Sequence, residues 1–201
     1  DLSFLDRSIQ NPVAILIISI ATGFWMLRSR KERSEAPLIP VPLTSYPGYE
    51  AYPSFSPDGT QVAFQWCTEE PAANCDIYVK QIGVEPPSRL TTDPAEDFSP
   101  AWSPDGQSIA FLRKVSATRM ALLIIPQRGG PERLLGESDI ASGWLPGPYL
   151  AWTADAKWLA LPWREVNKPD GGLFLFNVET RETRRLTTSL ELRDNNAPAF
   201  S

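Results

Sequence analysis

The hydrophobic pattern of this chain consists of short apolar runs, rich in aromatic and β-branched residues, separated by tight-turn sequences. In Phe98–Arg113, FSPAWSPDGQSIAFLR, two such runs flank the tetrapeptide Ser103-Pro104-Asp105-Gly106. Proline presets φ at the second position of a turn, aspartate bonds to its own backbone, and glycine tolerates positive φ. The segment therefore predicts a strand, a tight turn and a second strand.

The same pattern recurs along the chain. Ser54–Phe64 reads SFSPDGTQVAF, Ala151–Leu161 reads AWTADAKWLAL, and Pro198–Ser201 begins a fourth copy. The inner aromatic residues of the four copies are 47, 50 and 48 residues apart; they are Phe55, Trp102, Trp152 and Phe200. Repeats of about 40–50 residues with four strands each are the signature of propeller blades.

Each repeat contains four strand-like runs. They are residues 53–56, 61–65, 76–82 and 89–91, then 100–103, 108–112, 121–125 and 132–135, then 150–153, 158–161, 173–178 and 184–187. Runs such as ALLII and GLFLF lack polar alternation, as expected of a sheet covered on both faces. A β-sandwich would show clearer alternation and no long period. The predicted fold is all-β, a partial propeller of three four-stranded blades in residues 41–201, truncated at its C-terminal end.

Two parts of this region depart from the repeat. Thr153-Ala154-Asp155-Ala156 lacks both proline and glycine, so its turn is expected to differ in type. Residues around 140–148 are an insertion that predicts a longer loop. Residues 41–45 match the outermost strand of a blade but precede the first one, and are expected to pair with a blade encoded beyond Ser201.

A long apolar stretch precedes the repeats. Residues 8–27 are uncharged, and twenty helical residues span about 30 Å, the hydrocarbon thickness of a bilayer. We predict a transmembrane helix at 8–28, after the end of an upstream region (1–7) and before a basic, then proline-rich linker (29–40). A buried helix or a signal peptide is the alternative. Four basic residues follow the span and one precedes it, which by the positive-inside rule puts the repeats in the cytoplasm.

Charge and composition exclude several functions. The chain has 24 acidic and 19 basic residues and no basic stripe in its body, so we expect no nucleic-acid contact by this region. It contains no histidine, which excludes a Ser-His-Asp triad and any histidine-ligated metal site here, and two cysteines cannot build a four-cysteine zinc site. We expect no catalytic residue, metal or cofactor in the region.

The units PSFSPDGTQVAF and PAWSPDGQSIAF, with the outer-strand motif RLTTDPAED, resemble the TolB-like, WD40-like β-propeller repeats of bacteria. The resemblance covers residues 41–201. One membrane span and a proline-rich spacer before such repeats also resemble bacterial proteins in which a winged-helix DNA-binding domain or a Ser/Thr kinase precedes the span. The resemblance implies that the propeller is a sensor or interaction module outside the cytoplasm. The basic residues that follow the predicted span indicate the opposite side of the membrane.

Cys67 and Cys75 flank the sequence TEEPAAN between two neighbouring predicted strands. Partners in a hairpin approach within disulfide range, so a bridge is one possibility and two separate buried thiols are the other. A bridge would favour an oxidising compartment.

Acidic residues recur at two places in the repeat. Asp58, Asp105 and Asp155 suggest a metal site at first sight, but turn chemistry accounts for them and they fall one per blade. Glu50 and Asp97 each lie five residues before the inner aromatic residue, and Asn195 holds the same place in the fourth copy. We expect these three in loops around one mouth of the central channel, where they would meet a protein or small-ligand partner; a solvated acidic rim is the alternative.

These observations favour a non-catalytic, membrane-tethered propeller that acts as a binding or sensor module of a larger signalling or transcription-regulatory protein. A second hypothesis is the propeller of a serine peptidase, whose blades gate a hydrolase domain encoded further along. A third is a scaffold in the cell envelope.

Overall fold

The computed structural model describes residues 40–68, 74–139, 149–168 and 171–187. The chain divides into two compact units, residues 1–42 and 43–201, and the second contains nearly all of the described residues. The predicted span at 8–28, the insertion at 140–148 and Asn195 lie outside the described residues. Within the described part, no helix has the length and apolar character needed to cross a membrane.

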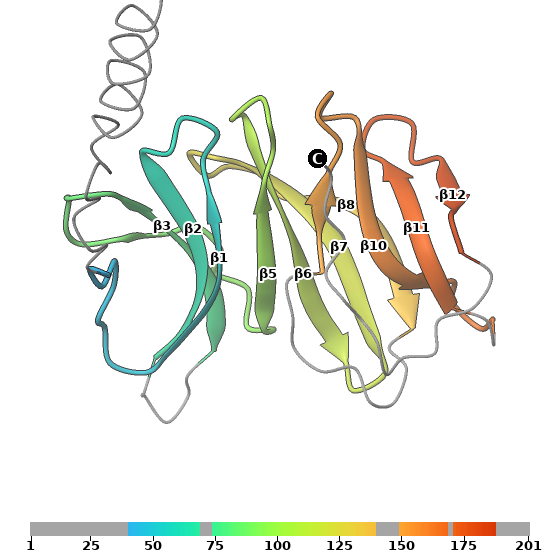
Figure 1. The fold of residues 1–201 in the computed structure, drawn as a ribbon. Coiled ribbons are helices and arrows are strands. Elements are labelled where there is room, and N and C mark those ends of the chain that lie inside the picture. The colour runs from blue at the N-terminus through green and yellow to red at the C-terminus, as the bar shows by residue number, and fades with distance from the viewer. Residues whose placement is uncertain (1–39, 69–73, 140–148, 169–170, 188–201) are drawn as a thin grey trace, which may run out of the picture. The chain divides into compact units, whose positions relative to one another are not determined.

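The described part of the second unit consists of three four-stranded antiparallel sheets (Figure 1). The first sheet contains β1 (Tyr49–Phe55), β2 (Gln61–Cys67), β3 (Cys75–Gln81) and β4 (Ser88–Arg89). The second sheet contains β5 (Asp97–Trp102), β6 (Ser108–Ser116), β7 (Arg119–Pro126) and β8 (Arg133–Asp139). The third sheet contains β9 (Ala151–Trp152), β10 (Trp158–Arg164), β11 (Gly171–Asn177) and β12 (Thr183–Arg185). Strands that are consecutive in sequence are neighbours in every sheet. Each of the twelve expected runs overlaps one of these strands, and the predicted all-β architecture is confirmed for the described residues.

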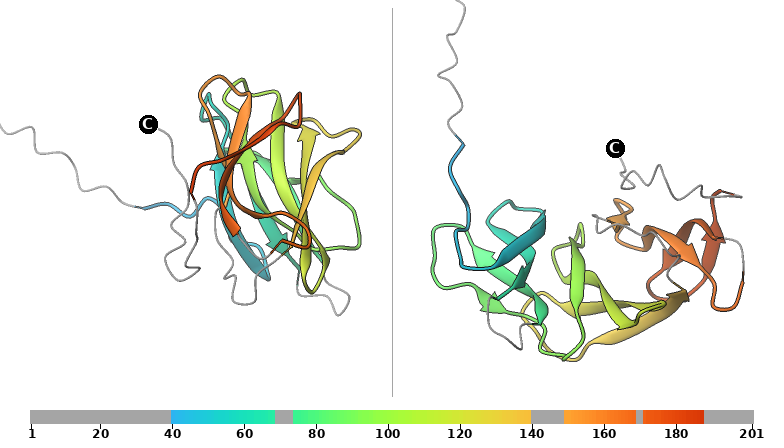
Figure 2. Two further views of the ribbon diagram at one scale, coloured as in Figure 1. Left: turned by 90° about the vertical axis from the view of Figure 1, so that its right-hand side faces the viewer. Right: turned by 90° about the horizontal axis from the view of Figure 1, so that it is seen from below.

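The three sheets follow one another around an arc, with the second between the other two (Figure 2). Side chains of the second sheet alternate between its two faces. Ile109 and Phe111 pack in a core with the first sheet, whereas Ala110 and Leu112 pack in a core with the third. All four are fully buried. Because successive side chains of a strand point to opposite faces, a sheet buried on both faces has an unbroken apolar run.

The third sheet shows what happens when one face is less covered. In β11, Phe174 and Phe176 are buried in the core with the second sheet. Leu173 and Leu175, which alternate with them, are only partly buried. Burial in β11 therefore alternates although the sequence does not.

The hairpin turn between the first two strands of each sheet has the same hydrogen bonds in all three sheets. In the second sheet, Ser103 Oγ donates to Asp105 Oδ1 (2.5 Å) and accepts from the N–H of Ser108 (3.0 Å), and Gly106 N donates to Ser103 O (2.9 Å). Asp105 Oδ1 also accepts from the N–H of Gln107. These bonds hold the pKa of the Asp105 carboxyl below its usual value, as equivalent bonds do for Asp58 and Asp155.

The expectation of a different turn type in the third sheet was wrong. Thr153 Oγ1 donates to Asp155 Oδ1 (2.6 Å), and Ala156 N donates to Thr153 O (2.9 Å). Ala156 adopts φ +56°, where Gly106 has φ +72°. Threonine thus replaces serine in the same bonds, and alanine accepts the left-handed conformation because the rest of the turn imposes it.

Residues 41–45 form no strand with any residue that the structure describes. Leu43 and Thr44 instead line a cavity of about 250 Å³ at the first sheet, together with Phe55 and Phe64. Next to them, the Tyr46 ring lies 4.9 Å from the Trp66 ring, whose N–H donates to Pro47 O (2.9 Å). The expected pairing of 41–45 with a blade beyond Ser201 stays a prediction.

Ala156→Gly is expected to raise the free energy of unfolding by about 0.5–1 kcal/mol, because it removes the strain of a left-handed alanine. The matched change in the opposite sense is Gly106→Ala, where no atom lies closer than 3.8 Å to the added Cβ and only the backbone conformation opposes it. It should lower the free energy of unfolding by a similar amount. Urea denaturation of both variants measures the two effects. Equal stability of Gly106→Ala and the parent would contradict the strain argument.

Candidate functional site

The starts of the inner strands β1 and β5 lie at the opposite end of the sheets from the repeated turns. In both strands the register shifts by one residue, between Ala51 and Ser54 in β1 and between Phe98 and Ala101 in β5. Tyr52 and Ser99 adopt φ +53° at these bulges. Ser99 Oγ accepts a hydrogen bond from the N–H of Tyr149 (2.8 Å), which ties the second bulge to the chain that enters β9.

Asp97 lies within strand β5, not in an open loop as expected. It pairs with Arg113 of β6, and its side chain is 0% exposed. Arg113 donates from Nε and Nη2 to the two Asp97 oxygens, at 2.7 and 2.8 Å. The same guanidinium donates to Glu132 (2.6 and 2.9 Å) and to Asp93 (3.2 Å). One arginine therefore connects β5, the segment before it and the segment before β8.

Burial raises the pKa of the Asp97 carboxyl to about 6. The hydrogen bonds of Arg113 and Thr91 and the positive charge of Arg113 act in the opposite direction and lower this pKa, but burial has the larger effect. Each Asp97 oxygen accepts a hydrogen bond from the Arg113 guanidinium, so this ion pair joins β5 to β6.

Glu50 occupies the equivalent place in β1, opposite Trp66 instead of an arginine. Its Oε1 accepts a hydrogen bond from the N–H of Tyr46 (3.3 Å), and it lines the cavity that contains Leu43 and Phe55. Glu50 and Asp97 therefore hold equivalent positions in neighbouring sheets but have different partners. Whether either binds a ligand stays a prediction, as it does for Asn195.

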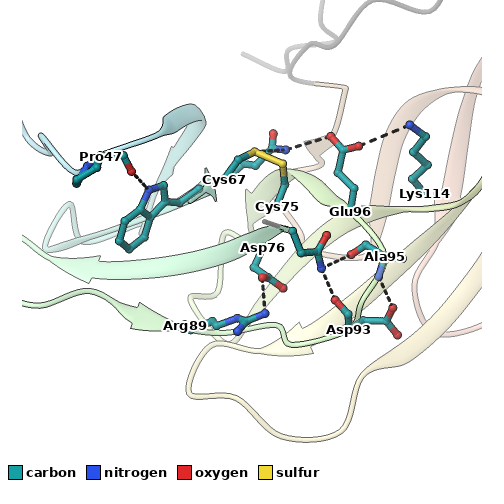
Figure 3. The surroundings of a disulfide bond; sticks show 12 residues. Pro47, Cys67, Cys75, Asp76, Arg89, Asp93, Ala95, Glu96 and Lys114 are labelled. Atoms are coloured by element: carbon teal, nitrogen blue, oxygen red, sulfur yellow. Dashed lines mark hydrogen bonds and ion pairs between the residues drawn. A yellow bond between two sulfur atoms is a disulfide. The ribbon is translucent and has the colours of Figure 1, made fainter. Parts of the chain in front are cut away.

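Cys67 and Cys75 are joined by a disulfide across the ends of β2 and β3, with their Cα atoms 4.1 Å apart (Figure 3). Asn74, beside Cys75, donates from its side-chain amide to the carbonyl oxygens of Asp93 and Ala95 (2.9 Å for Ala95). Asp93 Oδ1 in turn accepts from the N–H of Ala95 (2.8 Å). Asn74, next to the bridge, thus holds the segment that leads into β5, and this segment carries Asp93, one partner of Arg113.

Exposed polar and aromatic side chains lie beside this braced structure. Glu96 Oε1 accepts a hydrogen bond from the buried Gln65 (3.4 Å), and Lys114 Nζ lies 3.7 Å from Glu96 Oε2 (Figure 3). Burial is the main cause that raises the pKa of Tyr52. A side-chain hydrogen bond to Tyr49 and the nearby charge of Glu96 raise this pKa further. We call Tyr49, Tyr52, Glu96 and Lys114 the mouth rim. The described residues include no group of three or more carboxylates or thiols placed to hold a metal ion.

Solved β-propeller structures are similar to this chain. TolB from Acinetobacter baumannii matches 73% of it with a TM-score of 0.56 and 23% identity, over 34% of TolB. The propeller domain of the Trilobed protease from Pyrococcus furiosus matches 70% of the chain, over 42% of its own length, with a TM-score of 0.52 and 16% identity. A puromycin-hydrolysing peptidase from Mycobacterium tuberculosis matches 72%, over 22% of its own length, with a TM-score of 0.54 and 18% identity. The described sheets have a TolB-like β-propeller fold.

The chain spans less than half the length of each of these proteins. Their likeness shows the fold alone. No protein-family model matches the sequence, and no curated protein matches it.

Sequence reasoning missed Arg113 and the mouth rim. Arg113 directly follows the apolar run of β6, and an arginine on a strand with buried faces is a signal for a buried carboxylate partner. The hairpin turn alone, however, would place Asp97 opposite Lys114. Only the bulge at Ser99 brings it opposite Arg113.

Arg113→Met should lower the free energy of unfolding at pH 8 by about 3 kcal/mol, because it leaves Asp97 buried without its cation. Without Arg113 the native pKa of Asp97 rises further above its unfolded value, so the variant gains more stability than the parent as protonation neutralises Asp97. The deficit should therefore shrink as the pH is lowered from 8 toward 6 and change little below about 6, where Asp97 is protonated in both folded proteins. Denaturation across this range measures it.

Lys114→Met is the matched control, since Lys114 is half exposed and its ion pair is long. It should change stability by less than about 0.5 kcal/mol at every pH. An Arg113→Met deficit that is independent of pH would contradict the assignment of Asp97 as the buried anion.

Replacing both cysteines, Cys67→Ser with Cys75→Ser, should lower the free energy of unfolding by about 2–3 kcal/mol, the expected effect of a bridge that closes a short loop. Dithiothreitol should produce a similar loss in the parent protein and none in the double variant. Equal sensitivity of both proteins to dithiothreitol would show that the bridge does not stabilise the fold.

Proposed function

We propose that this chain is a non-catalytic, membrane-tethered β-propeller that binds a protein partner at its mouth rim, as the sensor module of a larger bacterial signalling or transcription-regulatory protein. The observation that carries the proposal is the contrast at this end of the sheets. Arg113, its three carboxylates and the disulfide form a rigid base, whereas Tyr49 is 57% exposed beside them.

A protein partner fits this chemistry better than a small ligand. Tyrosine supplies a large contact area at a low cost in conformational entropy, and such residues dominate the binding energy of protein interfaces. Glu96 and Lys114 are partly exposed charges that would steer and orient a partner. A rigid base also lowers the entropic cost of binding, because the rim residues are held in place before the partner arrives.

The membrane anchor at 8–28 and the position of the propeller outside the cytoplasm are part of the proposal. The Cys67–Cys75 disulfide supports this side of the membrane, because disulfides persist in oxidising compartments and are rare in the cytoplasm. The basic residues after the predicted span favour the opposite orientation.

Photo-crosslinking in bacterial cells tests the partner. Benzoylphenylalanine in place of Tyr49 in the full-length protein should yield a discrete crosslinked species on irradiation. Charge reversal at the neighbouring rim positions, Glu96→Lys with Lys114→Glu, should reduce its yield at least about tenfold if these charges orient the partner.

Benzoylphenylalanine in place of Ile82 is the matched control, because Ile82 is also partly exposed but follows β3 at the opposite end of the sheet. It should not yield the same species. The same crosslinked product from both positions, or no effect of the charge reversals, would contradict binding at the mouth rim.

A further inference from the structure

The Cys67–Cys75 disulfide lies beside the rim residue Glu96 (Figure 3). Its first cysteine also contacts the chain that carries Tyr49, the exposed tyrosine of the mouth rim. Cys67 pairs with Tyr49 in the β1–β2 ladder, and a Cβ added to Gly48 would lie 2.1 Å from the carbonyl oxygen of Cys67. The start of β1 is therefore packed directly against the backbone of a bridged cysteine.

The second cysteine adjoins the contact that holds the other side of the rim. Asn74 precedes Cys75 and donates from its side-chain amide to two carbonyl oxygens of the segment 93–95. Glu96 follows this segment, and its carbonyl oxygen accepts a hydrogen bond from the N–H of Lys114 (2.9 Å). The backbone next to the bridge thus contributes to holding Glu96 and Lys114 in place.

A third contact links a bridge sulfur itself to the rim. Gln65 is buried, and its side-chain amide donates both to Cys67 Sγ (3.6 Å) and to Glu96 Oε1 (3.4 Å). Once the bond between the sulfurs is cleaved, they must separate to van der Waals contact. This movement changes the position of the sulfur that Gln65 contacts, and through Gln65 it reaches the Glu96 carboxylate.

The bridge can be cleaved without unfolding the first sheet. Both cysteines are partly exposed, as attack by an external thiol requires. Strands β2 and β3 form seven backbone pairs, and the two cysteines are the last of these, at the end of the sheet that carries the rim. Reduction therefore loosens this end of the hairpin and leaves the other pairs of the ladder in place.

We propose that the Cys67–Cys75 bridge is a redox switch that regulates partner binding at the mouth rim, a role that rests on the proposed function for its partner. A thiolate of a dithiol reductant attacks one bridge sulfur and forms a mixed disulfide, while the other sulfur leaves as a thiolate and takes up a proton. The second thiol of the reductant then attacks the mixed disulfide. The reductant ends as its own disulfide and both cysteines end as thiols. The rim residues are then no longer held in place for the partner, and its binding weakens.

Amide hydrogen exchange of the full-length protein tests the switch without the partner. Dithiothreitol should speed exchange of the Lys114 amide, which bonds to Glu96 O, at least about tenfold relative to the oxidised protein. The Gly106 amide is the matched control, because it closes a turn at the opposite end of the sheets, and its exchange should not change. In the double variant Cys67→Ser with Cys75→Ser, the Lys114 amide should exchange fast with or without dithiothreitol.

Asn74→Ala separates the switch from the stability that the bridge contributes. This variant keeps the disulfide but loses the amide contacts to the segment 93–95, so its Lys114 amide should exchange fast even when the bridge is intact. The crosslink from benzoylphenylalanine at position 49 in cells should likewise fall at least about tenfold in Asn74→Ala and in the double cysteine variant.

The two readouts distinguish failure of the switch from failure of the proposed function. The switch is overturned if reduction leaves Lys114 exchange unchanged, or if it speeds Lys114 and Gly106 equally, which is general destabilisation. It is also overturned if the crosslink forms equally well with and without the bridge. Redox-dependent exchange at Lys114 with no crosslinked species in any variant would instead overturn the partner and leave the redox-dependent rim.

Discussion

Burial of both faces of the second sheet is the constraint on which the rest of this structure depends. Neighbouring side chains of β6 and β7 enter different cores, so almost every position of these strands must be apolar. Polar groups are consequently confined to the strand ends, where they need not be buried between sheets. This leaves two chemically distinct ends, one with the mouth rim and one with the repeated turns.

Asp97 and Arg113 are the exception, and the bulge at Ser99 is what permits them. Phe98 and Ala101 both face the third sheet although they are three residues apart, whereas Asp97 lies on the side of Trp102 and Phe111. A one-residue shift reverses the face of every residue beyond it. Without the bulge, either Phe98 would leave its core or Asp97 would lose its arginine. The strained φ of Ser99 is therefore offset by a bidentate ion pair and a hydrogen bond to Tyr149.

Local chemistry made the strands and turns predictable, because Pro, Asp and Gly act within a few residues of themselves. The same reasoning failed at Ala156. It gave too much weight to the absence of proline and glycine from this turn, and too little to the hydroxyl hydrogen bonds that Thr153 and Asp155 still form. It failed again at Asp97, because the environment of Asp97 depends on a register shift in β5 that no residue type in the sequence predicts. Periodicity in the sequence placed Glu50 and Asp97 at equivalent positions correctly, but the residue opposite each one, Trp66 or Arg113, decides what it does.

The two ends of the sheets also differ in how their charges are used. Near the mouth rim, Arg113 and its carboxylates satisfy one another and hold backbone segments in place, whereas Tyr49 and the charges of Glu96 and Lys114 remain at least partly exposed. At the turns, each aspartate fixes its own hairpin with one oxygen and keeps the other. A carboxylate held this way is oriented by its own hairpin and has no arginine partner among the described residues. The same residue type therefore joins distant segments at one end of the sheets and closes local hairpins at the other.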